Sequence, residues 1–406
     1  MLFACSCRQA LRRPGVALSP AVLASCSSSI HGRRTFVSDA DVDKARAYCV
    51  NQLRKGDYDA HLVRHFLPRG VQDAYLALRT LNLELARLPE TVSNPTIGAM
   101  RMQFWKDTIN NTFDGNPPRE PVSLLLYAAL AGLAARTSEG EGNWSSIKFW
   151  LQRFISTRQQ YMDNRPFASL AALEDYAEST YATLMYVTLA MLPLRSMHVD
   201  HLASHIGKAC GIAAILRGIP VLAAPNPPAA SGAVPSIPRR NPVLLLPLDV
   251  MADVGLREED VYRQGPEAPG LQEAVFRVAT RANDHLITAR EMLKNIRAGQ
   301  DPGHDYEHAG EMGHTYGEPA EAYEDEPETK WLGSDLGQKS SKSKAKANEA
   351  PDELRALQRG FNVLLEAVPA QDFLTRMEAA DFDAFRVKSG WKLPWSLYRA
   401  QATQKI

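Results

Sequence analysis

Three histidines recur at helical spacing, which is one way in which a protein gathers metal ligands on a single helix face. His198, His201 and His205 are three and four residues apart, and Asp200 lies between the first two. Histidines that partly cap a helix at the protein surface are more common than metal ligands. We therefore interpret this set as surface-facing and expect neither a metal nor a cofactor.

Other signatures of enzyme chemistry are missing from the sequence. His61 and His65 form an i, i+4 pair, but they lack the glutamate that accompanies such a pair in zinc hydrolases. No glycine-rich phosphate loop, nucleophile elbow or Cys-x-x-Cys motif is present. Beyond the first 38 residues the only cysteines are Cys49 and Cys210, which excludes a disulfide framework and suits a reducing compartment.

The composition excludes further classes of function. Apolar residues make up 45% of the chain, charged residues 23%, and the formal net charge is zero. Because there is no excess of basic residues, we expect no nucleic-acid partner. No apolar stretch reaches the roughly 20 residues of a membrane-spanning helix, so any membrane contact is expected to be peripheral.

The elements that position these residues are predicted to be helices. Apolar residues recur every three or four positions between Ala40 and Ala298, and alternating strand-like runs are almost absent. This periodicity predicts an all-α fold. The expected helices cover 40–54, 70–88, 95–113, 121–137, 144–161, 171–192, 198–218, 271–297 and 353–378, and prolines such as Pro193 and Pro220 separate them.

Three segments resemble motifs of the squalene/phytoene synthase family. Residues 75–86 begin with that family's Tyr-x-x-x-Arg, residues 207–222 resemble its second conserved helix, and residues 163–180 resemble its central helix, in which a tyrosine lines the cavity. The similarity extends from about residue 45 to 401, apart from one insertion. It implies an isoprenoid-synthase-like helical bundle.

Within this family the chain resembles the mitochondrial branch whose members assist the assembly of respiratory complex I. Five segments carry the likeness in the same order, and they are 82–86, 100–107, 176–180, 216–220 and 393–398. Each segment alone is a weak signal, whereas five in order are specific. The resemblance implies a protein whose partners are complex I subunits or other assembly factors.

The carboxylates that the catalytic members use are missing. Those enzymes condense prenyl diphosphates and need Mg²⁺, held by aspartates on two helices, to neutralise the leaving diphosphate. Glu84 lies two residues from the first box position, on another side of its helix, and cannot substitute. The resemblance therefore implies a non-catalytic protein, because the box positions carry Asn82, Leu83, Ala86, Gly218 and Leu222.

Several side chains of the motifs remain candidates for binding a ligand or partner. The guanidinium groups of Arg79 and Arg217 could hold an anionic headgroup. The favoured alternative is an ion pair, with Glu84 or Glu178 as a partner. The full candidate set is Tyr75, Arg79, Glu84, Arg101, Trp105, Tyr176, Glu178 and Arg217.

The aromatic residues near Arg101 leave two interpretations open. Phe104 and Trp105, beside Arg101 and Lys106, could form a partner-binding patch, since aromatic residues and arginine dominate interface hot spots. They could equally be the core side of the helix over 95–113.

Two segments stand apart from the predicted helical domain, which comprises 39–298 and 349–406. Residues 1–38 contain five arginines, many Ser and Ala and no acidic residue, a composition typical of a mitochondrial transit peptide. Residues 299–348 are acidic and then basic with few apolar residues, which predicts a disordered insertion.

These observations combine into one leading hypothesis and two alternatives. The leading hypothesis is a non-catalytic mitochondrial protein on the matrix side of the inner membrane that assists complex I assembly. One alternative is a transferase of prenyl-diphosphate or quinone metabolism with altered chemistry. The other is a module that binds a prenyl lipid without reacting it.

Overall fold

The computed structural model describes residues 37–92, 94–137, 144–192, 194, 196–223, 242–300, 339–388 and 390–406, with the backbone alone from 339 to 351. The predicted transit peptide therefore lies almost wholly outside the described residues, as does most of the predicted insertion. The last ten residues assigned to that insertion, 339–348, belong to the start of a helix. Residues 35–406 form one compact unit.

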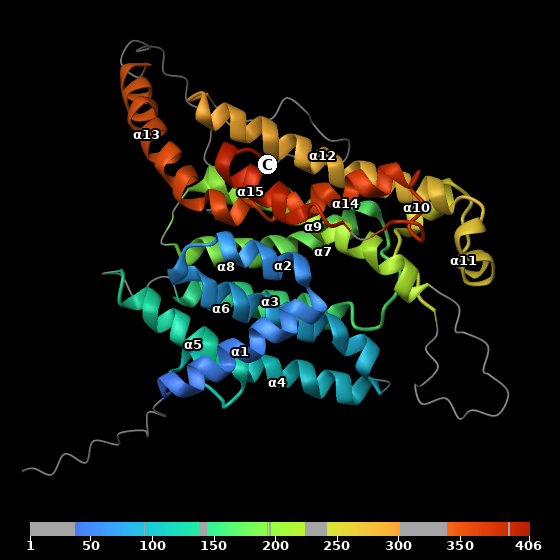
Figure 1. Ribbon diagram of the computed structural model, residues 1–406, viewed down its shortest axis with the longest axis horizontal. Coiled ribbons are helices and arrows are strands. Elements are labelled where there is room, and N and C mark those ends of the chain that lie inside the picture. Colours follow the sequence, from blue (N-terminus) through green and yellow to red (C-terminus); the bar gives the residue numbers. More distant parts are fainter. Residues whose placement is uncertain are drawn as a thin grey trace, which may run out of the picture. The chain divides into compact units, whose positions relative to one another are not determined.

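Every regular element in these ranges is a helix, which confirms the predicted all-α fold (Figure 1). The elements are α1 (Asp39–Gly56), α2 (Tyr58–Val63), η1 (Arg64–Phe66), α3 (Arg69–Thr91), α4 (Pro95–Phe113), α5 (Pro121–Ala134), α6 (Trp144–Gln160), α7 (Leu170–Ala177), the π-helical turn η2 (Glu178–Ala182), α8 (Thr183–Ala190), α9 (Met197–Leu222), α10 (Leu248–Asp253), α11 (Glu258–Gln264), η3 (Gly265–Glu267), α12 (Leu271–Arg297), α13 (Lys339–Leu364), α14 (Ala367–Ala379) and α15 (Leu393–Thr403).

Helix α9 is the centre of the bundle. It packs against α12, α7, η2, α14, α13 and α8, and in Figure 1 it lies between α12 above and α3 below. Two glycines allow the closest of these approaches. A Cβ atom on Gly207 would lie 2.3 Å from the Cα atom of Ala182, and one on Gly211 would lie 2.4 Å from the Cβ atom of Ala177. Larger residues at these two positions would force α9 away from η2 and α7.

Two hydrophobic clusters make up the core. One is centred on α9 and α12 and includes Ile212, Val278 and Phe361. The other joins α1, α3, α4, α5 and α6 and includes Leu81 and Phe154. Helices α3 and α9, one from each cluster, face each other across the cavities described below.

The sequence prediction placed the long helices well and the interruptions less well. The predicted helix 171–192 contains the π turn η2, and the predicted helix 353–378 is divided at Leu365 and Glu366. Pro220 does not end α9, which continues for two further residues to Leu222. The short helices α2, α10, α11 and α15 were not predicted.

By length and composition α9 could cross a membrane, and it is the one described helix of which this is true. The sequence prediction missed it because Ser, His, Lys and Gly interrupt its apolar residues. In the fold, however, fourteen of its residues are buried among neighbouring helices. Its apolar character is thus accounted for by the core of the bundle.

Candidate functional site

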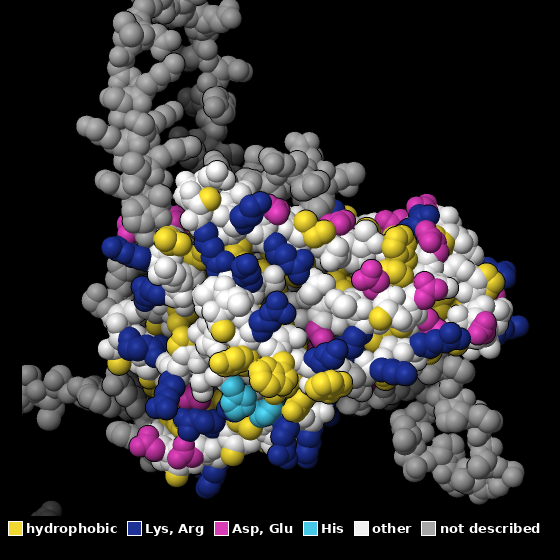
Figure 2. All heavy atoms as spheres, turned by 45° about the horizontal axis from the view of Figure 1, so that its top comes forward, with side chains coloured by type: hydrophobic (Ala, Val, Ile, Leu, Met, Phe, Trp, Pro, Cys, Tyr) yellow, Lys and Arg dark blue, Asp and Glu magenta, His cyan; other side chains and the backbone are white. Residues whose placement is uncertain are grey.

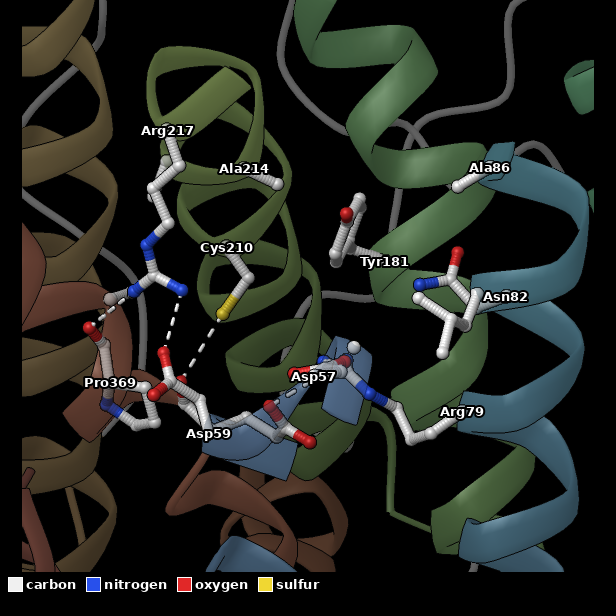
Figure 3. A pocket seen from close by; sticks show the side chains of 15 residues that line it. Asp57, Asp59, Arg79, Asn82, Ala86, Tyr181, Cys210, Ala214, Arg217 and Pro369 are labelled. Atoms are coloured by element: carbon white, nitrogen blue, oxygen red, sulfur yellow. Dashed lines mark hydrogen bonds and ion pairs between the residues drawn. The ribbon is translucent and has the colours of Figure 1, made fainter. Parts of the chain in front are cut away.

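Two adjoining cavities lie between α3 and α9. The first has a volume of about 170 Å³ and the second about 370 Å³. Ala86, Tyr181, Ala214 and Arg217 line both of them. In Figure 3, Arg79, Asn82 and Ala86 project from α3 on one side, Cys210, Ala214 and Arg217 from α9 on the other, and Tyr181 lies between. Arg79, Tyr176, Arg217 and the five box positions therefore lie around one space, whereas Tyr75, Glu84, Arg101, Trp105 and Glu178 do not line it.

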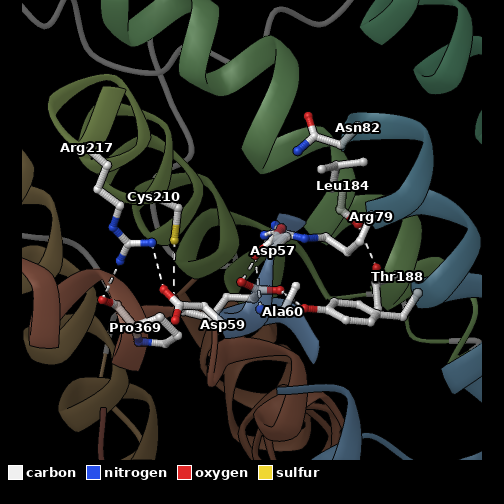
Figure 4. Close-up of polar contacts among 12 residues, drawn as sticks. Asp57, Asp59, Ala60, Arg79, Asn82, Leu184, Thr188, Cys210, Arg217 and Pro369 are labelled. Atoms are coloured by element: carbon white, nitrogen blue, oxygen red, sulfur yellow. Dashed lines mark hydrogen bonds and ion pairs between the residues drawn. The ribbon is translucent and has the colours of Figure 1, made fainter. Parts of the chain in front are cut away.

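Arg79 is the buried cation of the first cavity. One of its terminal nitrogens lies 2.5 Å from the Asp57 carboxylate, and the other lies 3.8 Å from that of Glu366 (Figure 4). Asp57 is the N-cap of α2, and Glu366 is the N-cap of α14. Burial alone would lower the pKa of Arg79, but these two carboxylates outweigh it and raise the pKa well above its ordinary value. The guanidinium is therefore held charged by the protein itself.

Glu366 connects this ion pair to two further elements. Its carboxylate accepts a hydrogen bond from the Tyr75 hydroxyl, and its backbone oxygen accepts one from the Cys210 thiol at 3.3 Å. Burial raises the pKa of Glu366 even though Arg79 and Tyr75 act in the opposite direction. Burial likewise raises the pKa of Tyr75 well above its usual range, so its hydroxyl stays a donor.

Arg217 is the second cation, and it is also paired internally. It donates to Asp59 at 2.6 Å and to the backbone oxygen of Pro369 at 2.9 Å, and it stacks 4.7 Å from the centre of the Phe373 ring. Figure 4 shows this group on the opposite side of α2 from Arg79. Contacts with a carboxylate, a carbonyl and a ring fix the guanidinium in one orientation.

Arg158 of α6 is a third guanidinium, at the wall of the second cavity. It donates to the side-chain oxygen of Asn82 and to the Tyr176 hydroxyl. It also lies over the Tyr176 and Tyr181 rings, 5.3 and 5.7 Å from their centres. Its Nε atom is buried without a hydrogen-bond partner among the described residues, and the same is true of Arg79 Nε.

Comparisons with known proteins identify the family to which this fold belongs. The family model for squalene/phytoene synthase matches residues 53–303. The chain belongs to the squalene/phytoene synthase family.

The family assignment has support from both sequence and structure. The chain is 34% identical over 275 residues to the mouse protein named NADH dehydrogenase (ubiquinone) complex I, assembly factor 6. The match covers 68% of this chain and 74% of the mouse protein. It is 31% identical over 269 residues to the Drosophila melanogaster homologue, covering 65% and 73%. The crystal structure of a dehydrosqualene synthase superposes with a TM-score of 0.55 at 14% identity, covering 90% of this chain and 98% of that one. The predicted family, branch and fold are thereby confirmed.

The resemblance to catalytic squalene/phytoene synthases implies Mg²⁺ in the cavity between these two helices. The residues at the box positions show whether this chain could bind the ion. The five box positions all line the cavities, Asn82 and Leu83 the first, Gly218 and Leu222 the second, and Ala86 both. Four of the five have no side-chain oxygen, and the Asn82 oxygen already accepts from Arg158. Mg²⁺ requires several oxygen ligands in octahedral geometry. The residues at these positions do not fit the ion.

The carboxylates that do line the first cavity lie elsewhere in the chain. They are Asp57, Asp59 and Glu366, and each is within ion-pair distance of Arg79 or Arg217. In this member of the synthase family, acidic groups from α2 and from the start of α14 neutralise the arginines of α3 and α9. The cavity therefore combines cations and anions that belong to the same chain.

The predicted ion pairing of the two arginines is found, but the predicted partners are wrong. Glu84 accepts a 3.3 Å hydrogen bond from Tyr48 at the surface, and Glu178 accepts from Tyr186 and from Ser204 at 2.7 Å. Neither glutamate takes part in the ion pairs of Arg79 and Arg217 described above. Asp57, Asp59 and Glu366 were missed because they come from separate segments and have no motif of their own.

The open question about α4 is answered residue by residue. Trp105 is buried in the core, whereas Phe104 is about half exposed and Arg101 is on the surface. Arg101 and Trp105, both candidates for partner binding, therefore occupy different environments. Arg158 was missed as well, although it follows Leu151, Phe154 and Ile155 on the buried face of α6, a position where an arginine is unusual.

The histidines of α9 are not the surface set that the sequence indicated. His198 is near the surface and lies 3.4 Å from Glu353, but His205 is fully buried, 3.0 Å from the ring of His285. His285 in turn contacts Glu174 at 2.7 Å. Across the described parts of the chain, no group of three or more His, Cys, Asp or Glu has the geometry of a metal site. The contacts from His205 through His285 to Glu174 form a buried polar connection between α9, α12 and α7.

Proposed function

We propose that this protein assists the assembly of mitochondrial complex I without catalysing a synthase reaction. The observation that carries the proposal is the similarity to proteins named complex I assembly factor 6 over about two thirds of the chain, with more than two thirds of their own length covered in mouse and fly. The cavity supports the non-catalytic part of the proposal. An allylic diphosphate would have to leave without metal-held neutralisation of its charge.

The internal ion pairs add a second argument against synthase chemistry. Arg79 and Arg217 are the groups best suited to hold a diphosphate, and each is already neutralised by a carboxylate of the chain. A diphosphate entering the first cavity would meet Asp57 and Asp59 as well as the arginines, because all of them line it, and like charges repel. The charged groups of the site thus stabilise one another within the fold.

The proposed location is the matrix side of the mitochondrial inner membrane, with peripheral attachment. The acid-free, arginine-rich residues 1–38 support import, and the relatives' names support a mitochondrial role. Proposed partners are complex I subunits or other assembly factors. Removing residues 1–38 should leave the protein in the cytosol on cell fractionation.

Two experiments test the proposed function. Isolation of the native protein from mitochondria should bring complex I subunits or assembly intermediates with it, and loss of the protein should lower the amount of assembled complex I. The purified mature protein should release no pyrophosphate from farnesyl or geranylgeranyl diphosphate with Mg²⁺, next to a competent synthase as control. Metal-dependent turnover well above background would establish the altered transferase instead.

A second candidate, binding of a prenyl lipid without reaction, is favoured by the second cavity. Its wall includes Leu85, Phe167, Val221, Leu245 and Arg158, whose buried Nε atom has no hydrogen-bond partner among the described residues. An apolar chain beside a polar headgroup would match that lining. Mass spectrometry of lipids extracted from the native protein decides: an enriched isoprenoid supports this candidate, and a lipid profile equal to that of the Leu85→Trp variant contradicts it.

A further inference from the structure

Helix α15 presents an unusual outer face. Its inner face is ordinary, since Leu393, Leu397 and Ala400 are buried at i, i+4 and i+7 against the bundle. Contacts with α14 and α2 hold the helix in place. The outer side of such a helix is normally polar, which is not the case here.

Large aromatic side chains occupy that outer side. Trp395 and Tyr398 on α15 are 70% and 60% exposed, and Trp391, two residues before the helix begins, is 77% exposed. The rings of Trp395 and Tyr398 meet edge to face at 6.2 Å. Single exposed apolar residues are common on proteins, but three exposed aromatic rings so close together in the sequence, here called the aromatic stripe, are not.

The charge around the aromatic stripe has one sign. From Ala384 to Ile406 the sequence contains no acidic residue and five basic ones. Arg386 pairs with Asp383 at 2.9 Å, whereas Lys388, Lys392, Arg399 and Lys405 make no ion pair with any described residue. The Lys392 ammonium lies 5.8 Å from the centre of the Trp391 ring.

Acidic groups next to this region are engaged. Asp372 pairs with Arg376 at 2.9 Å, and Asp383 pairs with Arg386. On the adjacent helix α2, Tyr58 is 56% exposed and stacks on His61 at 5.8 Å, which adds a further aromatic group. Figure 2 shows the same contrast over a wider surface: Lys and Arg spread over its left half and centre among hydrophobic side chains, and Asp and Glu gather mainly at its right end and lower left edge.

We propose that this C-terminal face, formed by Lys388, Trp391, Lys392, Trp395, Tyr398 and Arg399, docks on an anionic membrane surface. Trp and Tyr favour the membrane–water interface, where a ring can be buried while its polar atom stays hydrated. Lysine and arginine beside them are attracted to negatively charged headgroups. The absence of acidic residues favours a lipid surface over a protein partner, because protein surfaces carry both signs of charge and reward matched pairs.

The inference deepens the proposed peripheral role. It rests on the proposed function only in taking the mitochondrial inner membrane as the surface that is bound. The C-terminal face also sets the orientation of the protein on the membrane. A protein docked through α15 has the aromatic stripe in the headgroup region and carries its cavities outside the hydrocarbon core, held by the inner face of the same helix.

The test is co-sedimentation of the full chain with vesicles of phosphatidylcholine alone or mixed with phosphatidylglycerol. Binding should require the anionic lipid and weaken as salt is added. The triple variant Lys388→Gln/Lys392→Gln/Arg399→Gln should bind about 100-fold more weakly, since each base near the surface contributes about fivefold. Trp391→Ala/Trp395→Ala should also lose most binding. The matched control is Met100→Ala/Phe104→Ala, which removes exposed apolar side chains of α4 and should bind like the parent.

Three outcomes would overturn the proposal. They are equal binding to neutral and anionic vesicles, unchanged binding by both the basic and the aromatic variants, and parent-like vesicle binding by variants that no longer co-purify with a protein in detergent extracts, which would assign the face to a protein partner. Parent-like thermal unfolding of the variants excludes misfolding. Failure to bind vesicles leaves complex I co-purification intact as a separate test of the proposed function.

Discussion

The cavity between α3 and α9 and the outer face of α15 both contain arginine or lysine beside aromatic rings, yet they treat the positive charge in opposite ways. In the cavity, Arg79 and Arg217 each contact a carboxylate brought in from another segment. On α15, Lys392 and Arg399 have no such partner among the described residues.

Burial explains the difference. An unpaired charge removed from water costs several kcal/mol, so a buried guanidinium must find an anion within the fold. An exposed base remains hydrated and needs none, which leaves it available to an outside anion. The same residue types therefore hold the structure together in one region and present a binding surface in the other.

Breaking the cavity pair should have the largest effect. Arg79→Ala leaves the partly buried Asp57 and the buried Glu366 without their cation, and we expect the free energy of unfolding to fall by about 3–5 kcal/mol. Urea denaturation measures this loss. The matched control is Arg399→Ala on the outer face, which should change stability by less than about 0.5 kcal/mol. Equal effects of the two substitutions would remove the distinction between the regions.

A second buried ion pair predicts sensitivity to acid. Burial would raise the pKa of Glu174, but hydrogen bonds and positive charge from His285 and Arg281 lower it from 4.5 to about 2. Below about pH 5 the unfolded chain binds a proton that the folded protein does not, so this part of the stability, at most about 3 kcal/mol, is lost as pH falls toward 2.

The lowered pKa of His285, caused first by burial, adds to the loss below about pH 6.5, because the unfolded histidine is protonated first. Glu174→Gln should weaken the dependence of unfolding free energy on pH between about 5 and 3. An unchanged slope in that range would show that other carboxylates dominate acid unfolding.

The half-exposed cavity cation should matter less. Arg217 is 36% and Asp59 26% exposed, so water screens their attraction. Arg217→Ala should lower the free energy of unfolding by about 1 kcal/mol, including loss of the contact with the Phe373 ring. Arg217→Lys keeps the charge but not the two-pronged contact, and should fall between parent and alanine variant. A loss as large as that of Arg79→Ala would mean that exposure does not rank these pairs.

The smallest effect is expected on the outer face. Lys388→Gln and Lys392→Gln should leave the thermal midpoint within experimental error, because neither side chain has an ion-pair partner among the described residues and the contact of Lys392 with the exposed Trp391 ring is at the surface. Differential scanning calorimetry of the two variants, with Arg376→Gln as a paired control that should destabilise slightly more, checks this. A clear fall for either lysine would reveal a structural role for the face.

The fold could be predicted from the sequence because its long helices repeat a three- and four-residue apolar pattern over many turns. Helix α12, for example, begins and ends at Leu271 and Arg297, as its periodicity predicts. The short helix α2 spans six residues, too few for a period to show. Since α2 supplies Asp59 and follows Asp57, the failure to predict it also hid the partners of both cavity arginines.

The positions around the cavity were predictable and their contacts were not. Tyr75, Arg79, Asn82 and Arg217 were found because a motif has local spacing. Their partners depend on which distant segment arrives next to them, and neighbouring glutamates such as Glu84 were a poor guide. The aromatic stripe on α15 was present in the sequence as a family-like ending, but only burial of Leu397 on the opposite side shows which way it faces.

The hydrogen bond from Tyr75 to Glu366 spans 291 residues of the chain, which has a consequence for how the protein is made. Synthesis proceeds at roughly 5–20 residues per second, so Tyr75 leaves the ribosome roughly 15 to 60 seconds before Glu366, whereas Asp57, the nearest carboxylate to Arg79, is made before that arginine. During that interval α3 can pack against α1 and α5, but the cavity wall on its other side is incomplete. The first motif to be synthesised is therefore among the last to complete its native contacts.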